Sequence, residues 1–353
     1  MLVLTVCRHG GMGGISPPSH FRIPEKRGKV LGWSDRSIRS NKEFLYTVEE
    51  SRLPPLGVAF TGTLRDCPDT PQEWNALLRG LEWRLRRRGL VLGHLITEWQ
   101  ARRVPHLHAA LFWDREGIVS SKFRKELHAA LAAEDSRQLV ELLCVLVRFA
   151  WLDVLRKRGH AADHGAQFAL PITDPMGWFE YVSKHAARGL SHYQRSPEKI
   201  PPGWLAQEST PRMWRKVGDW PVIDPQKVGI EDRGWRFWYR RRMRHWRTAK
   251  ARLAIAEAAQ RFAREPGQAN AWRWIHAKRG LVSARRSARC PDRKLCEVRG
   301  WNEWVPGSVQ LQLLEFMRGQ GAPLLKGSRI EVERWNRETG EIYMGSRMDW
   351  RKS

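Results

Sequence analysis

Residues 90–113 read LVLGHLITEWQARRVPHLHAALFW and predict a β-hairpin. Leu90–Trp99 and His106–Trp113 are apolar runs of strand length, and the polar residues between them suit a turn. Successive side chains of a strand point to opposite faces of a sheet, so His106 and His108 share one face. The residues that alternate with them are apolar and are expected to face the core. The hairpin therefore places two imidazoles together on the opposite face of the sheet.

Strands and helices alternate on both sides of this hairpin. Val58–Leu64 alternates and carries β-branched residues, which predicts a strand. Thr70 and Pro71 then supply an N-cap and a first helical residue for a helix that ends before Gly89. The order strand, helix, strand, strand favours an α+β fold, an antiparallel sheet with helices packed on one face. Further helices are expected at about residues 35–50, 121–133, 136–158 and 175–188, and a short strand at 167–172.

The chain of 353 residues carries a net charge of +25 and has a pI of about 10.7. This positive charge indicates a polyanionic partner, with nucleic acid as the first choice and an anionic membrane surface as its competitor. No window approaches the ~18 to 20 apolar residues of a membrane span, and the first residues lack a signal-peptide pattern, so we expect a cytoplasmic protein. The five scattered cysteines argue against a disulfide framework and against a paired-cysteine zinc site.

Composition divides the chain into three parts. Residues 1–34 are rich in Gly, Pro, Ser and basic residues without periodicity, which predicts a flexible basic arm. Residues 35–225 contain the predicted sheet and its helices. Residues 226–353 begin with strongly basic helical sequence and predict a basic, mainly helical region with a DNA-binding or accessory role.

The hairpin also predicts a metal site. Two imidazoles on one strand face can bind a divalent cation if a third ligand is near, and Glu98 on the preceding strand can lie beside His106 and His108. Three protein ligands leave coordination positions open, as catalytic sites require. His94 shares the face of Glu98 and is either a rival ligand or a polar surface residue. The alternative is that the His-x-His pair is only structural.

The helix predicted at Pro175–Arg188 carries a candidate nucleophile. Tyr181 and Lys184 are three residues apart and therefore neighbour each other on the helix surface, with His185 beside them. A tyrosine phenol has a pKa of ~10 and is a poor nucleophile at neutral pH unless a nearby ammonium group or metal favours the phenolate. The alternative is an amphipathic tyrosine at the edge of the core with a lysine that extends past it.

Three segments in this order resemble the motifs of HUH endonucleases, specifically the single-tyrosine rolling-circle replication initiators of plasmids and single-stranded DNA phages. They are Phe60–Leu64 (FTGTL), His106–His108 (HLH) and Tyr181–Lys184 (YVSK). Glu98 has the spacing of the third metal ligand in several such initiators. Trp214–Gly218 (WRKVG) is similar, more loosely, to replication proteins of filamentous phages and related plasmids.

The resemblance covers about residues 56–220 and identifies 35–225 as an HUH endonuclease domain with an RRM-like core. It has two departures. Gly62 stands where a β-branched or bulky residue is usual. No second tyrosine lies within a turn of Tyr181, and Tyr193 falls outside the predicted helix, so two-tyrosine enzymes are poorer models.

The resemblance implies a mechanism and partners. Glu98, His106 and His108 would hold Mg²⁺ or Mn²⁺, and Tyr181 would attack a DNA phosphate to form a 5′-phosphotyrosyl ester and release a 3′ hydroxyl that primes synthesis. Lys184 would orient the phosphate or stabilise the phenolate. The implied substrate is single-stranded DNA or a melted or supercoiled origin inside a bacterial host cell. A host helicase and polymerase are further partners that the resemblance leaves open.

The segment Arg233–Arg252 predicts a nucleic-acid surface, because it contains nine Lys and Arg residues and neither Asp nor Glu. Its interleaved aromatic residues either stack on bases or form a buried stripe. The expected DNA-binding residues are Arg236, Arg240, Arg241, Arg242, Arg244 and Arg247.

Other functions remain open at this stage. An HUH transposase or relaxase would use the same chemistry in DNA mobility or conjugation. A non-catalytic nucleic-acid-binding protein would use its charge alone, and its activities would not need Tyr181. The sequence does not distinguish a phage replicon from a plasmid replicon.

Overall fold

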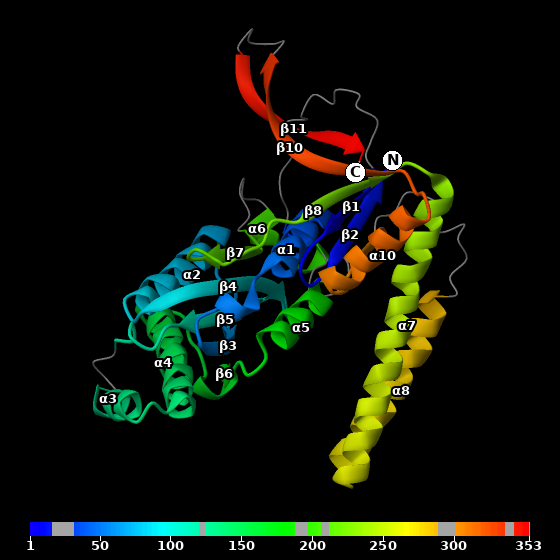
Figure 1. The fold of residues 1–353 in the computed structure, drawn as a ribbon. Coiled ribbons are helices and arrows are strands. Elements are labelled where there is room, and N and C mark those ends of the chain that lie inside the picture. Colours follow the sequence, from blue (N-terminus) through cyan, green and yellow to red (C-terminus); the bar gives the residue numbers. More distant parts are fainter. Residues whose placement is uncertain are drawn as a thin grey trace. The chain divides into compact units, whose positions relative to one another are not determined.

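A computed structural model describes residues 1–15, 32–119, 124–187, 197–205, 212–288, 301–335 and 342–352 (Figure 1). The chain divides into two compact units. The sheet unit comprises residues 21–222 and contains the predicted hairpin. The discontinuous unit comprises residues 1–20 and 223–353. The two units are described separately.

In the described part of the sheet unit, five strands form an antiparallel sheet in the order β6-β3-β5-β4-β7. The predicted hairpin is present as β4 and β5, and Glu98 lies directly opposite His106. The α+β class is therefore confirmed. The strands are β3 (Leu56–Thr63), β4 (Leu90–Trp99), β5 (Pro105–Trp113), β6 (Phe168–Pro171) and β7 (Trp214–Val217).

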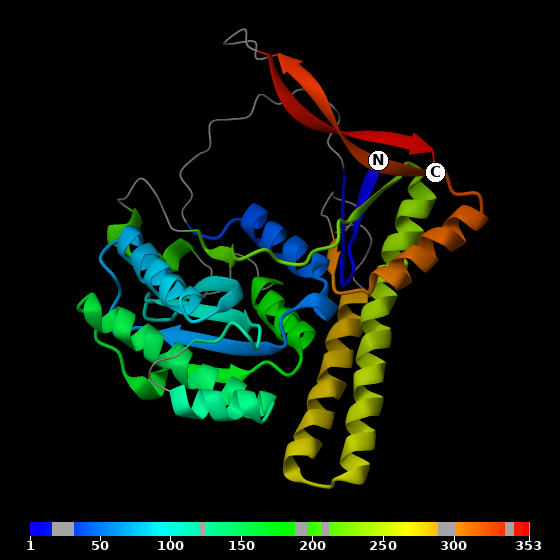
Figure 2. The same cartoon turned by 60° about the vertical axis from the view of Figure 1, so that its left-hand side comes forward.

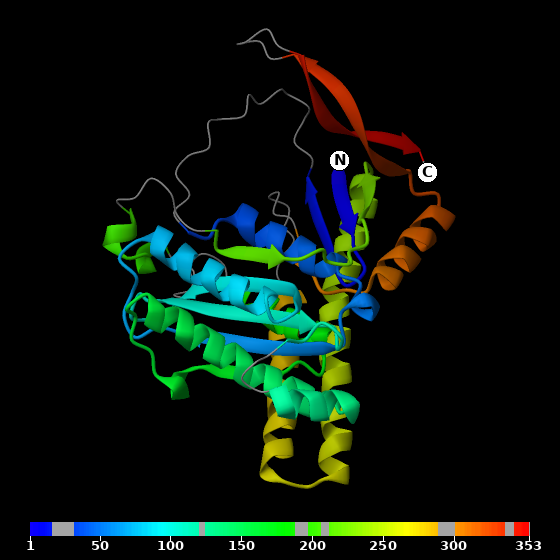
Figure 3. The ribbon, with the colours of Figure 1, turned by 90° about the vertical axis from the view of Figure 1, so that its left-hand side faces the viewer.

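Helices contact both faces of this sheet, so the expectation of helices on one face was incomplete. The helices α2 and α4 cover one face (Figure 3). Within this layer the ring of Trp151 meets the rings of Phe60 and Trp74 edge to face. The other face meets α1 through a 2.7 Å hydrogen bond between His94 Nε2 and Asn41 Oδ1. The helices are α1 (Asp35–Thr47), α2 (Pro71–Arg86), α3 (Arg124–Ala132), α4 (Ser136–Lys157), α5 (Pro175–Ala187) and α6 (Pro202–Leu205).

The core leaves no room for a side chain at Gly62. A Cβ at this position would lie 2.9 Å from Phe60 Cε1 and 3.1 Å from Trp151 Nε1, both closer than ordinary contact. The large rings of Phe60 and Trp151 are both fully buried and occupy the volume that a β-branched residue would need. The strand itself forms as predicted.

In the described part of the discontinuous unit, six strands form an antiparallel sheet in the order β11-β10-β8-β1-β2-β9. Figure 2 shows α7 and α8 side by side as a long helical hairpin, and Asp232 caps α7 by accepting a hydrogen bond from Trp235 N. The elements are β1 (Leu2–Val6), β2 (Gly11–Ile15), β8 (Gln226–Ile230), α7 (Arg233–Arg264), α8 (Gln268–Ala288), β9 (Trp301–Glu303), α10 (Gly307–Gly319), β10 (Leu324–Trp335) and β11 (Ile342–Lys352).

The predicted flexible arm at residues 1–34 is wrong for residues 2–15. Leu2–Val6 pairs with both β2 and β8, and Leu2, Leu4 and Val6 are buried. The apolar run LVLTV carried this signal, but the glycines that follow it concealed the second strand. Residues 16–31 lie outside the described part of the chain. The mainly helical expectation for 226–353 also missed the long β10–β11 hairpin.

Adding a methyl group at Gly62 tests the packing of this core. Gly62→Ala should lower the free energy of unfolding by about 1–3 kcal/mol, because Phe60 and Trp151 must move. Urea unfolding followed by tryptophan fluorescence measures the change. Gly280→Ala is the control, since a Cβ in this helical position meets nothing within 4 Å, and it should be neutral or stabilising by ~0.5–1 kcal/mol. Equal effects of the two substitutions would contradict the packing argument.

Candidate active site

The register of the sheet assembles the residues that the sequence singled out. Thr61, His108 and Ile96 stand opposite one another on β3, β5 and β4. The adjacent row on the same face places Glu98 directly opposite His106. Because directly opposed residues of antiparallel strands point to the same face, the predicted trio of Glu98, His106 and His108 shares one surface.

The three predicted ligands lie close together. His108 Nε2 is 3.6 Å from Glu98 Oε2, and the rings of His106 and His108 have centroids 4.6 Å apart. Glu98 is almost completely buried, and the His108 side chain is only slightly exposed. The hairpin has therefore brought a carboxylate and two imidazoles into one partly buried cluster.

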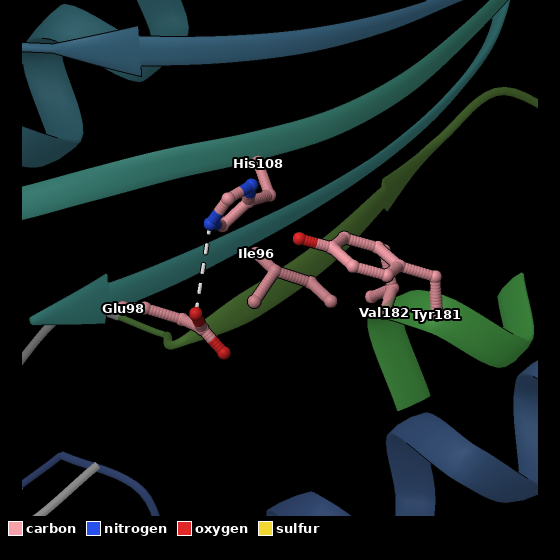
Figure 4. Close-up of a pocket in the computed structure, with 5 residues that line it drawn as sticks. All are labelled: Ile96, Glu98, His108, Tyr181 and Val182. Atoms are coloured by element: carbon pink, nitrogen blue, oxygen red, sulfur yellow. Dashed lines mark ion pairs between the residues drawn. The ribbon is translucent and has the colours of Figure 1, made fainter. Parts of the chain in front are cut away.

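The helix α5 brings Tyr181 to the same place. A small pocket is lined by Ile96, Glu98, His108, Tyr181 and Val182. Figure 4 shows the Tyr181 side chain extending from α5 so that its phenolic oxygen points toward His108. Tyr181 is about half exposed, whereas Val182 is buried, so the helix is anchored by its apolar face while the phenol stays accessible.

Other predicted site residues are placed differently or lie outside the described side chains. The backbone of Lys184 and His185 belongs to α5, but the described side chains end at Val182. All six predicted DNA-binding arginines lie on α7, in the discontinuous unit, and Arg241 and Arg242 are exposed. The side chains of Arg244 and Arg247 also lie outside the described part.

Two threonines on β3 contact the histidines, and sequence reasoning missed this role. Thr61 Oγ1 lies 3.3 Å from His108 Nδ1, and Thr63 Oγ1 lies 3.1 Å from His106 Nδ1. Contacts at Nδ1 fix the ring orientation and leave Nε2 for another partner. The signal was present in FTGTL, where the threonines alternate with residues of the opposite face, as the histidines do in HLH.

Glutamine side chains hold this arrangement from both sides. Gln100 Nε2 lies 3.2 Å from His106 Nδ1, and its Oε1 accepts a 2.8 Å hydrogen bond from Arg102 Nε. Buried Gln167 accepts from Thr63 N at 2.8 Å and donates to Thr63 O at 3.0 Å, which replaces strand pairing at the end of β3. The position of the Thr63 hydroxyl beside His106 therefore depends on Gln167.

Burial keeps His106 neutral. Desolvation, together with the neighbouring His108, lowers the pKa of His106 to about 4. A neutral imidazole is the form that binds a metal ion, because a protonated ring has no lone pair to give. At neutral pH a cation therefore does not have to displace a proton from His106.

The donor set suits a divalent cation, although its side chains are not arranged as a finished metal site. Among the described residues, no group of three or more His, Cys, Asp and Glu side chains is placed to hold a metal ion. The chemistry nevertheless fits, since two imidazoles and one carboxylate on neighbouring strand positions are ligands for catalytic divalent metals. His108 Nε2 and Glu98 Oε2, the atoms that would bind a cation, face each other at 3.6 Å.

His94 is neither a ligand nor a surface residue. It is buried, donates from Nε2 to Asn41 Oδ1, and packs against the rings of Phe44, Phe179 and Trp214. Burial lowers the pKa of His94 to about 3. It belongs to the aromatic cluster beneath α1 and α5, which anchors these helices beside the pocket.

The buried His94 predicts a pH dependence of stability. The unfolded chain takes up a proton here below about pH 6.5 but the folded chain only near about 3, so the free energy of unfolding falls as pH drops through this window. The slope from one such histidine reaches ~1.4 kcal/mol per pH unit. His94→Asn should reduce the slope by this amount in urea titrations between pH 7 and 4, and His164→Asn, at an exposed position, is the control. A wild-type slope in the His94→Asn protein would contradict the prediction.

Comparison with known proteins places the whole chain in a family. It is 40% identical to a protein of Xylella fastidiosa strain 9a5c named as a replication protein, across 91% of this chain and 98% of that protein. It is 37% identical to the replication-associated protein of Pseudomonas phage Pf3, across 92% of this chain and all of the phage protein. No family model matches the sequence, and no solved structure matches the chain. The predicted resemblance to replication proteins is confirmed, and the chain belongs to the family of replication proteins that includes the replication-associated protein of phage Pf3.

Proposed function

We propose that this protein initiates rolling-circle DNA replication by nicking single-stranded DNA with Tyr181. The observation that carries the proposal is the pocket in which Tyr181 meets Glu98 and His108. These residues come from α5, β4 and β5 and are brought together only by the fold. The names of the relatives, which are replication proteins of a phage and of a bacterium, support the biological role.

In the proposed reaction the phenolic oxygen of Tyr181 attacks the phosphorus of a DNA phosphodiester. A bond from Tyr181 to the 5′ phosphate forms, the bond from phosphorus to the 3′ oxygen breaks, and the released 3′ hydroxyl can prime synthesis by a polymerase. The ester conserves the energy of the broken bond, so the reverse reaction rejoins the strand. We propose that Lys184 orients the phosphate.

The residues of the hairpin would hold Mg²⁺ or Mn²⁺ through Glu98, His106 and His108. A bound divalent cation supplies Lewis-acid polarisation of the phosphate. The contribution of the chain is to present a neutral His106 and to hold the rings of His106 and His108 in fixed orientations, through Thr63 and Thr61, beside an accessible phenol. The pocket is small and lies next to an exposed tyrosine, so a flexible unpaired DNA strand can bend a phosphate into it, whereas a stiff duplex that carries a second strand cannot.

A covalent adduct tests the nicking activity. The protein is incubated with Mn²⁺ and labelled single-stranded oligonucleotides that tile its own replicon, and products are separated on a denaturing protein gel. We expect a labelled protein that disappears completely in Tyr181→Phe and in His106→Ala/His108→Ala, because the nucleophile or the cation ligands are lost. His128→Ala, which removes an exposed histidine of α3, is the control and should keep the adduct.

Two results would contradict the assignment. An adduct that survives Tyr181→Phe would show that another residue is the nucleophile, and Tyr193 would be tested next. Tight DNA binding without any adduct would favour a non-catalytic nucleic-acid-binding protein. A transposase or relaxase of the same superfamily would give the same adduct, and products from origin DNA would separate it from an initiator.

We further propose that the hairpin of α7 and α8 binds DNA phosphates. Arg241 and Arg242 are exposed, and α8 has neither Asp nor Glu in its sequence. Several aromatic residues of α7 contribute to the core: Tyr239 is buried, and Trp235 and Trp238 pack against the same apolar cluster. No helix in the described ranges combines the length and apolarity needed to cross a membrane.

Salt dependence tests these arginines. Each phosphate contact that is lost should reduce the slope of log K against log salt by about 0.7 on single-stranded DNA, so Arg241→Gln/Arg242→Gln should reduce it by about 1.4. Fluorescence anisotropy with a labelled oligonucleotide measures the slope. Arg137→Gln is the control, because Arg137 is exposed on α4 and pairs with Glu141. An unchanged slope in the double variant would assign the DNA contacts to other residues.

A further inference from the structure

Two large apolar side chains are exposed on β6. Phe168 is 62% exposed and Leu170 is 64% exposed, although both belong to a strand. The strand β6 is short and forms one edge of the sheet, beside β3. Large apolar side chains that are exposed together on an edge strand offer a contact surface, so their position relative to the site becomes important.

The register places both residues on the face that carries the site. Phe168 stands opposite Thr61 and Leu170 opposite Ala59 on β3, while Thr61 in turn stands opposite His108 on β5. Opposed residues share a face, so Phe168, Thr61 and His108 form one row. Two strand spacings of ~4.8 Å put the backbone of Phe168 about 10 Å from that of His108.

The side of the site face that is formed by β3 and β6 is more accessible than the side next to α5 and α1. On the far side of His108, Val182 of α5 borders the pocket with Ile96, and Trp214 of β7 stacks on Phe44 of α1. On the near side, the β3 residues of this face, Ala59, Thr61 and Thr63, are only partly buried. A strand of DNA whose phosphate reaches His108 and Tyr181 therefore has room to continue over β3 and β6.

We propose that Phe168 is a stacking platform for a base of single-stranded DNA next to the phosphate that is cut, and that Leu170 extends this platform along β6. The proposal rests on the proposed nicking function and adds the position of the substrate. An exposed aromatic ring accepts any base on its π face, and such stacking contributes strongly to single-strand binding. The Arg102 guanidinium, which donates to the backbone oxygens of Leu64 and Arg65, adds positive charge at the same ends of the strands.

An added β-strand from a second protein chain is the competing occupant of this edge. It would use the backbone of β6 and would not depend on an aromatic side chain. The net charge of +25 and the row that links Phe168 to the candidate site favour the polyanion.

Equilibrium binding of the full-length protein tests the platform. The probe is a fluorescein-labelled oligothymidylate, measured by anisotropy in EDTA so that no cleavage occurs, and the comparison probe is an abasic strand of equal length. Phe168→Ala should weaken oligothymidylate binding about 5- to 100-fold and abasic binding far less, while Phe168→Trp should restore the wild-type affinity. Trp83→Ala, which removes an exposed ring of α2 on the opposite side of the sheet, should bind as wild type does.

The adduct assay and the binding assay together test the platform and the nicking function independently. If the wild type forms the Tyr181 adduct but Phe168→Ala binds both probes as wild type does, the platform is overturned and the nickase stands. If the wild type forms no adduct but Phe168→Ala loses affinity only for the base-bearing probe, the platform stands and the nickase fails. A Phe168→Ala protein that changes only its oligomeric state, seen by size-exclusion chromatography, would also overturn the platform in favour of strand pairing.

Discussion

The pairing of β4 with β5 is the constraint on which the site depends. The register that puts Glu98 opposite His106 also puts Ile96 opposite His108 and thereby forms the floor of the pocket. A slip of one residue would turn both histidines into the apolar core and turn Leu107 toward solvent. The hydrophobic core beneath α2 and α4 opposes such a slip, so packing on one face of the sheet determines the chemistry available on the other.

On the face of the sheet that carries the candidate site, one group of side chains anchors the helices, and Tyr181 stays accessible. Around His94, the rings of Phe44, Phe179 and Trp220 form a buried aromatic cluster that holds α1 and α5 on the sheet. Tyr181, two residues after the buried Phe179 on the same helix, has an exposed side chain. The tyrosine is thus accessible although its helix is anchored, which is the combination that the proposed role as a nucleophile requires.

Much of this arrangement could be predicted from local sequence, because the relevant signals are short. Strand alternation predicted the shared face of His106 and His108, and Thr70, Pro71 and Gly89 predicted the limits of α2 within a few residues. The contact of Thr63 with His106 could not be predicted, since it depends on which residues of β3 and β5 stand opposite each other. The strands at residues 2–15 were missed because β8, which pairs with the first of them, lies more than 200 residues further along the chain.

That distant pairing affects how the chain is made. Val6 must pair with Gln226, so about 220 residues are synthesised between the two halves of this contact. At ~5–20 residues per second, the first strand waits on the order of 10–40 s for β8, while the complete sheet unit of residues 21–222 leaves the ribosome in the meantime. The unit that carries the candidate site can therefore fold first, as an insertion between two segments that have not yet paired, while the apolar run LVLTV can pair with β2 but not with β8.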